Sequence, residues 1–207
     1  MYALPTGNCG PCLKEGTARL SGAAAVQHRN SHSFLAYWDS LRGDAALPDR
    51  KDFNPDQIRH LVGHTLILDV NEPAAPKYLY AGPDLCKLYG RDLSGCNFFS
   101  GWDRDSMEAI SGILKRAGEA KRPICMTSIG RAEESAPVQI ETVLALFLSG
   151  DGCLFIGHQQ KLSDQRTLTD RPLTSQRLTA CRLILETDDH LLFRPKQHLP
   201  TRALMPA

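Results

Sequence analysis

The sequence lacks any long apolar run and any mark of secretion. None of its hydrophobic stretches approaches the roughly 18–20 residues that a membrane-spanning helix needs. The amino terminus has no basic region followed by an apolar stretch, which a secretory signal would contain. We therefore expect a cytoplasmic protein that has no membrane partner.

The chain also has almost no net charge. Its 24 basic and 23 acidic residues leave a formal charge of +1 at pH 7. No overall field would draw it to nucleic acid, anionic lipid or acidic substrates. We expect no nucleic-acid partner, and any partner must be recognised by local chemistry.

Sequence motifs of common enzyme classes are missing as well. There is no Gly-x-Ser-x-Gly, no His-Glu-x-x-His and no phosphate-cradling Gly-x-x-x-x-Gly-Lys. Asp69 and Glu72 are close in sequence, but they flank a turn, where carboxylates are routine. The sequence predicts a protein that is not an enzyme.

Seven cysteines stand at irregular positions, unlike a secreted disulfide framework, and we expect mostly reduced thiols. Cys9 and Cys12 copy the Cys-x-x-Cys motif of thioredoxins, in which one thiol has a lowered pKa. Such a pair works at the start of a helix after a central strand, but only eight residues precede this one. Chance thiols are the simpler interpretation.

No metal site is predicted. Cys9 and Cys12 have no second paired motif that would complete a tetrahedral zinc site. His28 and His32 form an i, i+4 pair, which we interpret as solvated surface histidines.

The two ends of the chain lack a clear structural pattern. Residues 1–30 mix glycine, alanine, proline and small polar residues, which predicts a flexible leader. Residues 161–207 form a C-terminal extension of uncertain order. Its apolar patch from Leu183 to Leu185 has three open roles: to cover the sheet, to add a strand to an edge, or to stay mobile.

Between the ends, the pattern predicts an α+β fold. Apolar side chains recur at helical spacing from about Ser33 to Leu41, and Gly43 stands where the helix would stop. A capping pattern at Asn54 predicts a second short helix that ends at Gly63. Strands are expected at 65–70 and 77–81, helices at 83–89 and from Asp103 to before Pro123, and strands at 124–129, 138–148 and 153–158. This order excludes a Rossmann-type parallel sheet.

Two clusters of residues resemble a PAS-like family of alphaproteobacteria, formerly of unknown function. The first comprises Tyr37, Trp38, Leu41, Arg42, Pro48, Arg50, Asp52, Pro55, Ile58, Arg59 and Leu61. The second comprises Tyr78 to Gly82, Leu85, Tyr89 to Arg91, Leu93 and Gly95. The resemblance implies a PAS-like domain over residues 31–160, with a five-stranded antiparallel sheet, helices on one face, two N-terminal helices before it, and a role in signalling.

A PAS domain has a cavity between its sheet and its helices. The resemblance makes eight inward residues the candidates for its lining: Leu85, Tyr89, Phe98, Ile110, Leu114, Met126, Leu144 and Phe155. Side chains of this size can also fill the space as ordinary core, since packed interiors leave few voids. No cofactor is predicted, and an unknown cavity ligand stays open.

Coloured cofactors find little support in the residues. The helices at 83–89 and 104–118 contain no histidine for haem iron, and we interpret His64 and His158 as strand-end or surface residues. Photosensory flavin-binding PAS domains use a cysteine that attacks the excited flavin, and Cys96 does not stand at the matching position. Either Gln159 or Gln160 resembles the residue near the last strand that contacts a flavin in such domains. We interpret both as residues of an exposed strand end.

Three functional hypotheses follow, in order of preference. The first is a stand-alone PAS-type regulator of bacterial signalling that acts by protein contact, as a homodimer or with a signalling partner, through Phe34, Trp38 and Leu41. The second is a haem- or metabolite-binding sensor. The third is a thiol-disulfide redox protein that uses Cys9 and Cys12.

Overall fold

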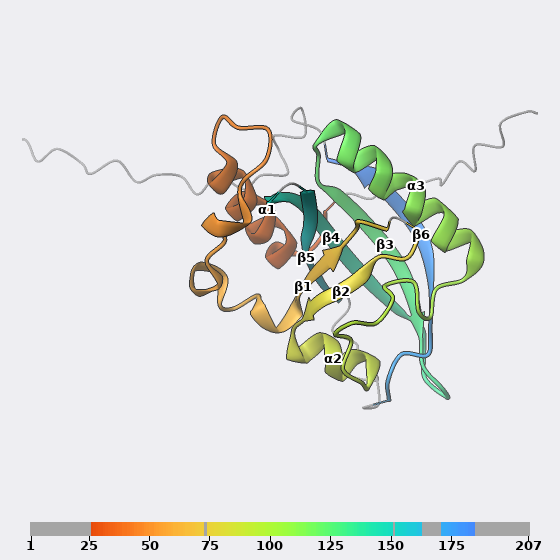
Figure 1. Ribbon diagram of the computed structural model, residues 1–207. Coiled ribbons are helices and arrows are strands. Elements are labelled where there is room, and N and C mark those ends of the chain that lie inside the picture. Colours follow the sequence, from red (N-terminus) through yellow and green to blue (C-terminus); the bar gives the residue numbers. More distant parts are fainter. Residues whose placement is uncertain (1–25, 73, 151, 163–170, 185–207) are drawn as a thin grey trace, which may run out of the picture.

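The computed structural model describes residues 26–72, 74–150, 152–162 and 171–184 (Figure 1). Most of the predicted leader, including Cys9 and Cys12, lies outside these residues, so the redox hypothesis stays a prediction. Among the described residues, no helix is both long enough and apolar enough to cross a bilayer.

The strands form one six-stranded sheet in which every neighbouring pair is antiparallel. Its order is β2-β1-β5-β4-β3-β6, so β5 and β4 lie in the middle. The strands are β1 (Thr65–Asp69), β2 (Lys77–Ala81), β3 (Ile124–Arg131), β4 (Val138–Ser149), β5 (Gly152–Lys161) and β6 (Ser175–Leu183). The predicted α+β fold with an antiparallel sheet is confirmed.

Strand β6 is the main difference from the prediction of five strands. It pairs with β3 along the outer edge, and Leu183 lies opposite Ile124. Of the three roles left open for the patch that begins at Leu183, the described part adds a strand to the edge, because β6 ends at Leu183. The alternation along β6 is interrupted at Thr179, an extra residue opposite the step from Thr127 to Ser128, and several residues of β6 are polar, which hides the strand in the sequence.

Helix α1 (Arg29–Arg42) begins inside the segment predicted as leader. The His28 ring caps it by accepting a hydrogen bond from Asn30 N, and Gly43 ends it with a positive φ of 52°. Phe34 is fully buried on the sheet, and Trp38 Nε1 donates to the Leu146 carbonyl at 2.8 Å. Burial of such a side chain stabilises the fold by about 1.5–3 kcal/mol. Ordered structure thus extends beyond residues 31–160 on both sides.

The predicted second helix is replaced by 3₁₀ turns at Pro55–Ile58 and Val62–His64, after a first one at Arg50–Asp52. Bonds from Leu61 N to Ile58 O and from His64 N to Leu61 O wind this stretch more tightly than an α-helix. This stretch packs closely against the residue that precedes the next helix, since a Cβ at Gly82 would collide with the Val62 and Gly63 carbonyls. The glycine lets the start of the next helix approach this turn.

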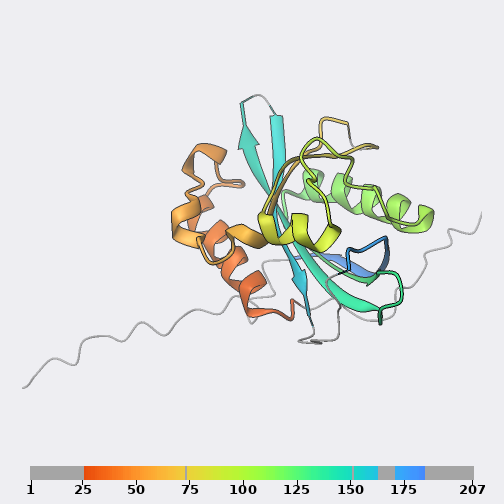
Figure 2. The same cartoon turned by 90° about the horizontal axis from the view of Figure 1, so that it is seen from below.

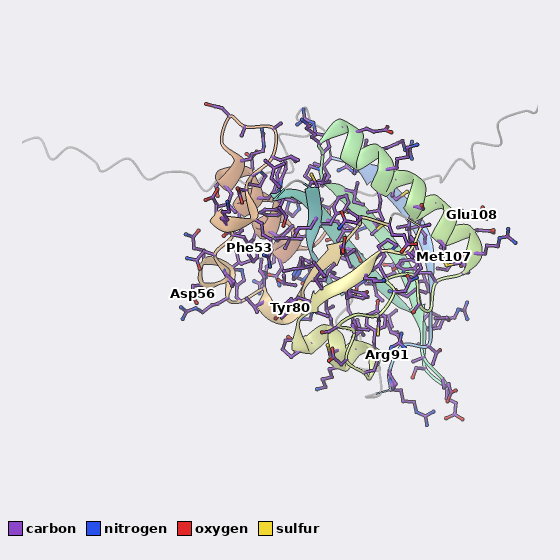
Figure 3. The ribbon with its side chains drawn as sticks, in the orientation of Figure 1. Phe53, Asp56, Tyr80, Arg91, Met107 and Glu108 are labelled. Carbon is purple, nitrogen blue, oxygen red and sulfur yellow. The ribbon has the colours of Figure 1, made fainter. Side chains whose placement is uncertain are left out.

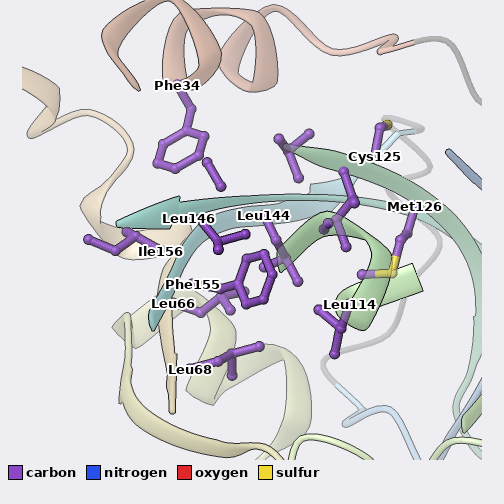
Figure 4. Close-up of a cluster of buried hydrophobic side chains, with 14 of the residues drawn as sticks. Phe34, Leu66, Leu68, Leu114, Cys125, Met126, Leu144, Leu146, Phe155 and Ile156 are labelled. Atoms are coloured by element: carbon purple, nitrogen blue, oxygen red, sulfur yellow. The ribbon is translucent and has the colours of Figure 1, made fainter. Parts of the chain in front are cut away.

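Two further helices, α2 (Pro83–Tyr89) and α3 (Arg104–Ala120), follow β2. In Figure 2, α1 and α3 lie on opposite sides of the sheet. Figure 4 shows Phe34 of α1 on one side of the central strands, and Leu66, Phe155 and Leu114 on the other. The central strands are therefore buried on both faces.

We expect Leu178→Ala to lower the free energy of unfolding by about 2–4 kcal/mol, because the side chain of Leu178 is buried between β6 and the core and its removal leaves a cavity. Urea denaturation measures the change. The exposed Ser175→Ala on the same strand is the control and should stay within about 0.5 kcal/mol of wild type. Equal stabilities for the two variants would mean that β6 lies outside the cooperative unit.

Candidate functional site

Polar side chains gather on the sheet face that α2 and α3 cover. The hydroxyl of Tyr89, the last residue of α2, lies 3.1 Å from Gln159 Oε1 and 2.8 Å from Gln176 Oε1. Gln159 Nε2 in turn donates to Thr142 Oγ1 at 2.9 Å. One helix and three strands thus contribute to a single buried network.

This network has an incomplete set of partners. A phenol has one proton, so Tyr89 can donate to only one of the two amide oxygens at a time. Gln176 is almost fully buried, and its Nε2 has no hydrogen-bond partner among the described residues. If the Gln176 amide were flipped so that its Nε2 donated to the Tyr89 oxygen, the Gln176 Oε1 would lack a hydrogen-bond partner instead. One polar atom of Gln176 remains available in either orientation.

Burial raises the pKa of the Tyr89 phenol, and the two glutamine hydrogen bonds lower it only in part. The hydroxyl therefore stays protonated at neutral pH and acts as a hydrogen-bond donor.

Local backbone geometry holds Tyr89 in place. Gly90 ends α2 in the left-handed conformation with φ 66°, and a Cβ there would collide with Pro172. Just beyond, Leu173 N donates to Leu88 O at 2.9 Å. The end of α2 is thereby tied to the segment that leads into β6.

A groove of about 370 Å³ opens beside this network, and we call it the β6 groove. Its lining residues come from the end of α2, the loop before α3 and the start of β6: Tyr89, Arg91, Ser100, Gly101, Thr174, Ser175 and Gln176. Two of these segments are joined by their backbones, because Gln176 N donates to Gly101 O at 2.7 Å. Figure 3 shows Arg91 at this end of the molecule.

A second polar cluster lies on the opposite face, under α1. The fully buried Glu141 carboxylate accepts hydrogen bonds from Gln27 N at 2.7 Å and His28 N at 3.1 Å. Gln160 Oε1 accepts from Asn30 Nδ2 at 3.1 Å. These bonds attach the beginning of α1 to β4 and β5.

His158 belongs to the same cluster. Its Nε2 lies 2.8 Å from Gln160 Oε1, and its ring meets the His64 ring edge-on at 5.8 Å. The pKa of His158 is lowered to about 4, chiefly by burial; the Gln160 hydrogen bond raises it in part, and the neighbouring histidines His64, His28 and His60 each lower it by a smaller amount. The imidazole is neutral at pH 7.

Comparison with known proteins identifies the fold family. A family model described as PAS domain matches residues 26–158. The chain belongs to the PAS domain family. PAS domains are sensory modules, and this match ends at His158, so β6 and the part of the groove that it forms lie beyond it. No curated protein matches the chain.

Solved structures similar to this PAS domain include light-oxygen-voltage (LOV) domains. One, studied with a flavin analogue, has 16% identity and a TM-score of 0.41 over 54% of this chain and 86% of its own. The light-state LOV domain of Aureochrome1 has 14% identity and a TM-score of 0.39, covering 54% of this chain and 91% of that one. The Rhodobacter sphaeroides LOV protein has 14% identity and a TM-score of 0.39, covering 55% and 71%.

The predicted cavity residues of the PAS domain come together in one apolar cluster. Tyr89 is half-buried and is the one of these residues that reaches the β6 groove. The other seven are packed in the core with at most 4% exposure: Leu85, Phe98, Ile110, Leu114, Met126, Leu144 and Phe155. Their role as a ligand cavity stays a prediction.

The predicted interface residues pack against the sheet of their own chain. Phe34 and Trp38 are buried between α1 and the sheet, and Leu41 is partly buried. Neither aromatic ring is on the surface of this PAS domain, so a partner would reach them only if α1 left the sheet.

Three polar residues of β5 were assigned wrongly. His158, Gln159 and Gln160 are buried, not exposed at a strand end, because β5 lies between β1 and β4 and is covered on both faces. His28 and His32 are also not simply solvated: His28 caps α1, and His32 Nε2 lies 3.1 Å from the Val26 carbonyl. Within the described ranges, no three His, Cys, Asp or Glu side chains are placed to share a metal ion.

Gln176 was missed because β6 was missed. The side chains of residues 175–178 alternate between exposed and buried, but three of these four residues are polar, so the sequence shows no apolar alternation that could have revealed the strand.

We expect Tyr89→Phe to lower the free energy of unfolding by about 1–3 kcal/mol, because two buried glutamine amides lose the phenol hydroxyl. Thermal and urea denaturation measure the loss. Tyr80→Phe on the edge strand β2, where the ring is 36% exposed, is the matched control and should be nearly neutral. A neutral Tyr89→Phe would show that the network contributes nothing to stability.

We expect His158 to make stability depend on pH. Its pKa of about 4 lies below the usual 6.5, so the unfolded chain takes up the proton first as the pH falls. The free energy of unfolding is therefore highest above pH 6.5, and about 3 kcal/mol of it is lost between pH 6.5 and 4. Urea titrations across this range should show a flatter profile for His158→Gln than for wild type. Exposed His60→Gln is the control, and parallel profiles for all three proteins would contradict the assignment.

Proposed function

We propose that this PAS domain is a signalling module that senses a small polar ligand in the β6 groove and passes the signal on by protein contact. The supporting observation is the buried Gln176 amide, which keeps an unpartnered polar atom beside the groove. Leaving such an atom without a partner costs about 1–3 kcal/mol, and most buried polar groups in proteins are satisfied. A ligand that supplies the missing bond would recover that free energy.

The groups around the groove favour binding over a reaction. They are an amide, hydroxyl groups, a guanidinium and a phenol whose pKa is raised by burial. No activated nucleophile or general base stands among these lining residues, so we propose a ligand and no substrate.

The position of the groove offers a route for the signal. Gln176 lies on β6, which pairs with β3, and Leu178 N on the same strand donates to Ser106 Oγ of α3 at 2.8 Å. A ligand that prefers one position of β6 over another would shift the population of that position. The edge of the sheet and the start of α3 would then move together.

Contact through the other edge is a second candidate. Strand β2 is an edge strand and exposes Leu79 at 55% and Tyr80 at 36%. The backbone edge of β2 is already occupied at Tyr78, whose N donates to Cys96 O and whose O accepts from Gly95 N. The exposed apolar side chains beyond it can still pack against a partner, including a second copy of this chain. The predicted homodimer would use this surface, with α1 remaining on its own sheet.

The haem alternative is not carried forward. Buried His158 lies on the α1 face, opposite the predicted cavity residues, and its Nε2 is hydrogen-bonded to Gln160.

Native mass spectrometry of the freshly purified full chain, beside its denatured mass, tests ligand and oligomer together. We expect extra mass that disappears on denaturation, and less of it in Ser100→Phe, because the ring would occupy the groove. Ser33→Phe, at an exposed position of α1, is the matched control and should keep the ligand. No extra mass in wild type, and no gain in melting temperature with a panel of polar metabolites, would overturn ligand sensing. If the protein is a monomer at all concentrations measured, the prediction of a homodimer is wrong.

A further inference from the structure

The β6 groove contains a single charged side chain. Among the described residues that line it, Arg91 alone carries a charge at neutral pH, and the others offer hydroxyl groups, an amide and backbone. Arg91 is exposed and forms no ion pair with another described residue. The carboxylate that follows it in the chain, Asp92, accepts a hydrogen bond from Ser94 N at 2.9 Å within its own loop. The lining therefore has an excess of one positive charge.

The end of α2 fixes the backbone of Arg91 at this groove. Arg91 N donates to Cys86 O at 3.1 Å, and Gly90 N donates to Lys87 O at 3.2 Å. These two bonds form the Schellman motif, which determines where the chain leaves the helix. The charge of Arg91 acts on the phenol of Tyr89, whose pKa it lowers against the larger effect of burial. Arg91 thus belongs to the same site as the buried polar network.

The second polar feature of the groove is the Gln176 amide. Its side chain is 4% exposed, and one of its two polar atoms lacks a partner in either orientation of the amide. An amide can present its oxygen or its NH₂ group, so it can bind a hydroxyl, a carbonyl or an amide of a ligand. A charged group is unsuited to this position, because a buried charge needs a counter-ion.

The size and charge of the groove limit the class of ligand. Its volume of about 370 Å³ is that of a small-molecule site. One guanidinium neutralises one negative charge, and its fork of N–H donors fits a carboxylate. A phosphate monoester carries about two negative charges and would leave one of them unbalanced. A cationic ligand would be repelled by Arg91.

We propose that the ligand of the β6 groove is a small carboxylic acid with one negative charge and one uncharged polar group, such as a hydroxy acid. Its carboxylate pairs with Arg91, and its polar group binds the Gln176 amide. The proposal rests on the proposed function and names the chemical class of its ligand.

Isothermal titration calorimetry on the full chain tests the class with probes matched in length. The hydroxy acids are lactate, γ-hydroxybutyrate and ε-hydroxyhexanoate, which differ in the spacing of their two groups. Propionate, butyrate and hexanoate keep only the carboxylate, and the corresponding diols keep only hydroxyl groups. We expect a hydroxy acid of one length to bind about tenfold or more tightly than either of its matched analogues, and its affinity to fall with added salt.

Substitutions of Arg91 test the carboxylate contact. In Arg91→Gln the affinity for the hydroxy acid should fall about tenfold or more, to that of the matched diol. Arg91→Lys should keep part of the affinity, since it retains the charge and loses the fork. Arg131→Gln is the matched control: Arg131 follows Gly130, which pairs with Gln176, so its side chain points to the other face of the sheet. This exposed arginine should leave the affinity unchanged.

Gln176→Met tests the second contact. The variant should bind the hydroxy acid no better than the simple acid of the same length, while its affinity for the simple acid stays that of wild type. It should fold, because Tyr89 keeps its hydrogen bond to Gln159. Unchanged melting temperatures check this for every variant.

The inference is overturned if no hydroxy acid binds better than both of its matched analogues, or if Arg91→Gln leaves the affinity unchanged. A preference for the hydroxy acid that survives in Gln176→Met also contradicts it. The proposed function is judged separately, by the extra mass in the native spectrum. If wild type carries that mass and Ser100→Phe loses it, ligand sensing stands and only the class of ligand is wrong.

Discussion

Strands β4 and β5 lie in the middle of the sheet, with α1 packed on one face and α2 and α3 on the other. The polar side chains that are buried on these two strands therefore find partners inside the protein and not in water, although His158 Nδ1 and Gln160 Nε2 have none among the described residues. Glu141, His158 and Gln160 do so on the α1 face, and Thr142 and Gln159 do so on the opposite face. The two polar clusters are both results of this double burial.

The two clusters serve different purposes. Under α1, the hydrogen bonds connect a helix to the sheet. Under α2, the network extends to β6 and ends at Gln176, where the wall of the groove begins. The added edge strand thus connects a buried network to the groove, which is the site proposed for a ligand.

Much of the fold could be predicted, because its elements carry local signals. The spacing of Phe34 and Trp38 gives α1, Asp103 caps α3, and the apolar runs give β1 to β5. Burial on β5 could not be predicted, since it depends on strands and a helix that pack from elsewhere in the chain. For the same reason the groove was missed: its lining comes from the end of α2, the loop before α3 and the start of β6, which are far apart in sequence. Tyr89 was found because the PAS resemblance pointed to that position.

The bonds that hold the start of α1 also determine the order of assembly. Gln27 and His28 reach across 114 and 113 residues to the Glu141 carboxylate, and Trp38 reaches across 108 to Leu146. Contacts of such long sequence separation carry a large loop-closure entropy and form late in folding. Helix α1 can dock only after β4 and β5 have paired, since their joint surface is its binding site. During synthesis the ribosome therefore releases α1 long before its site exists, and for that interval the rings of Phe34 and Trp38 are uncovered.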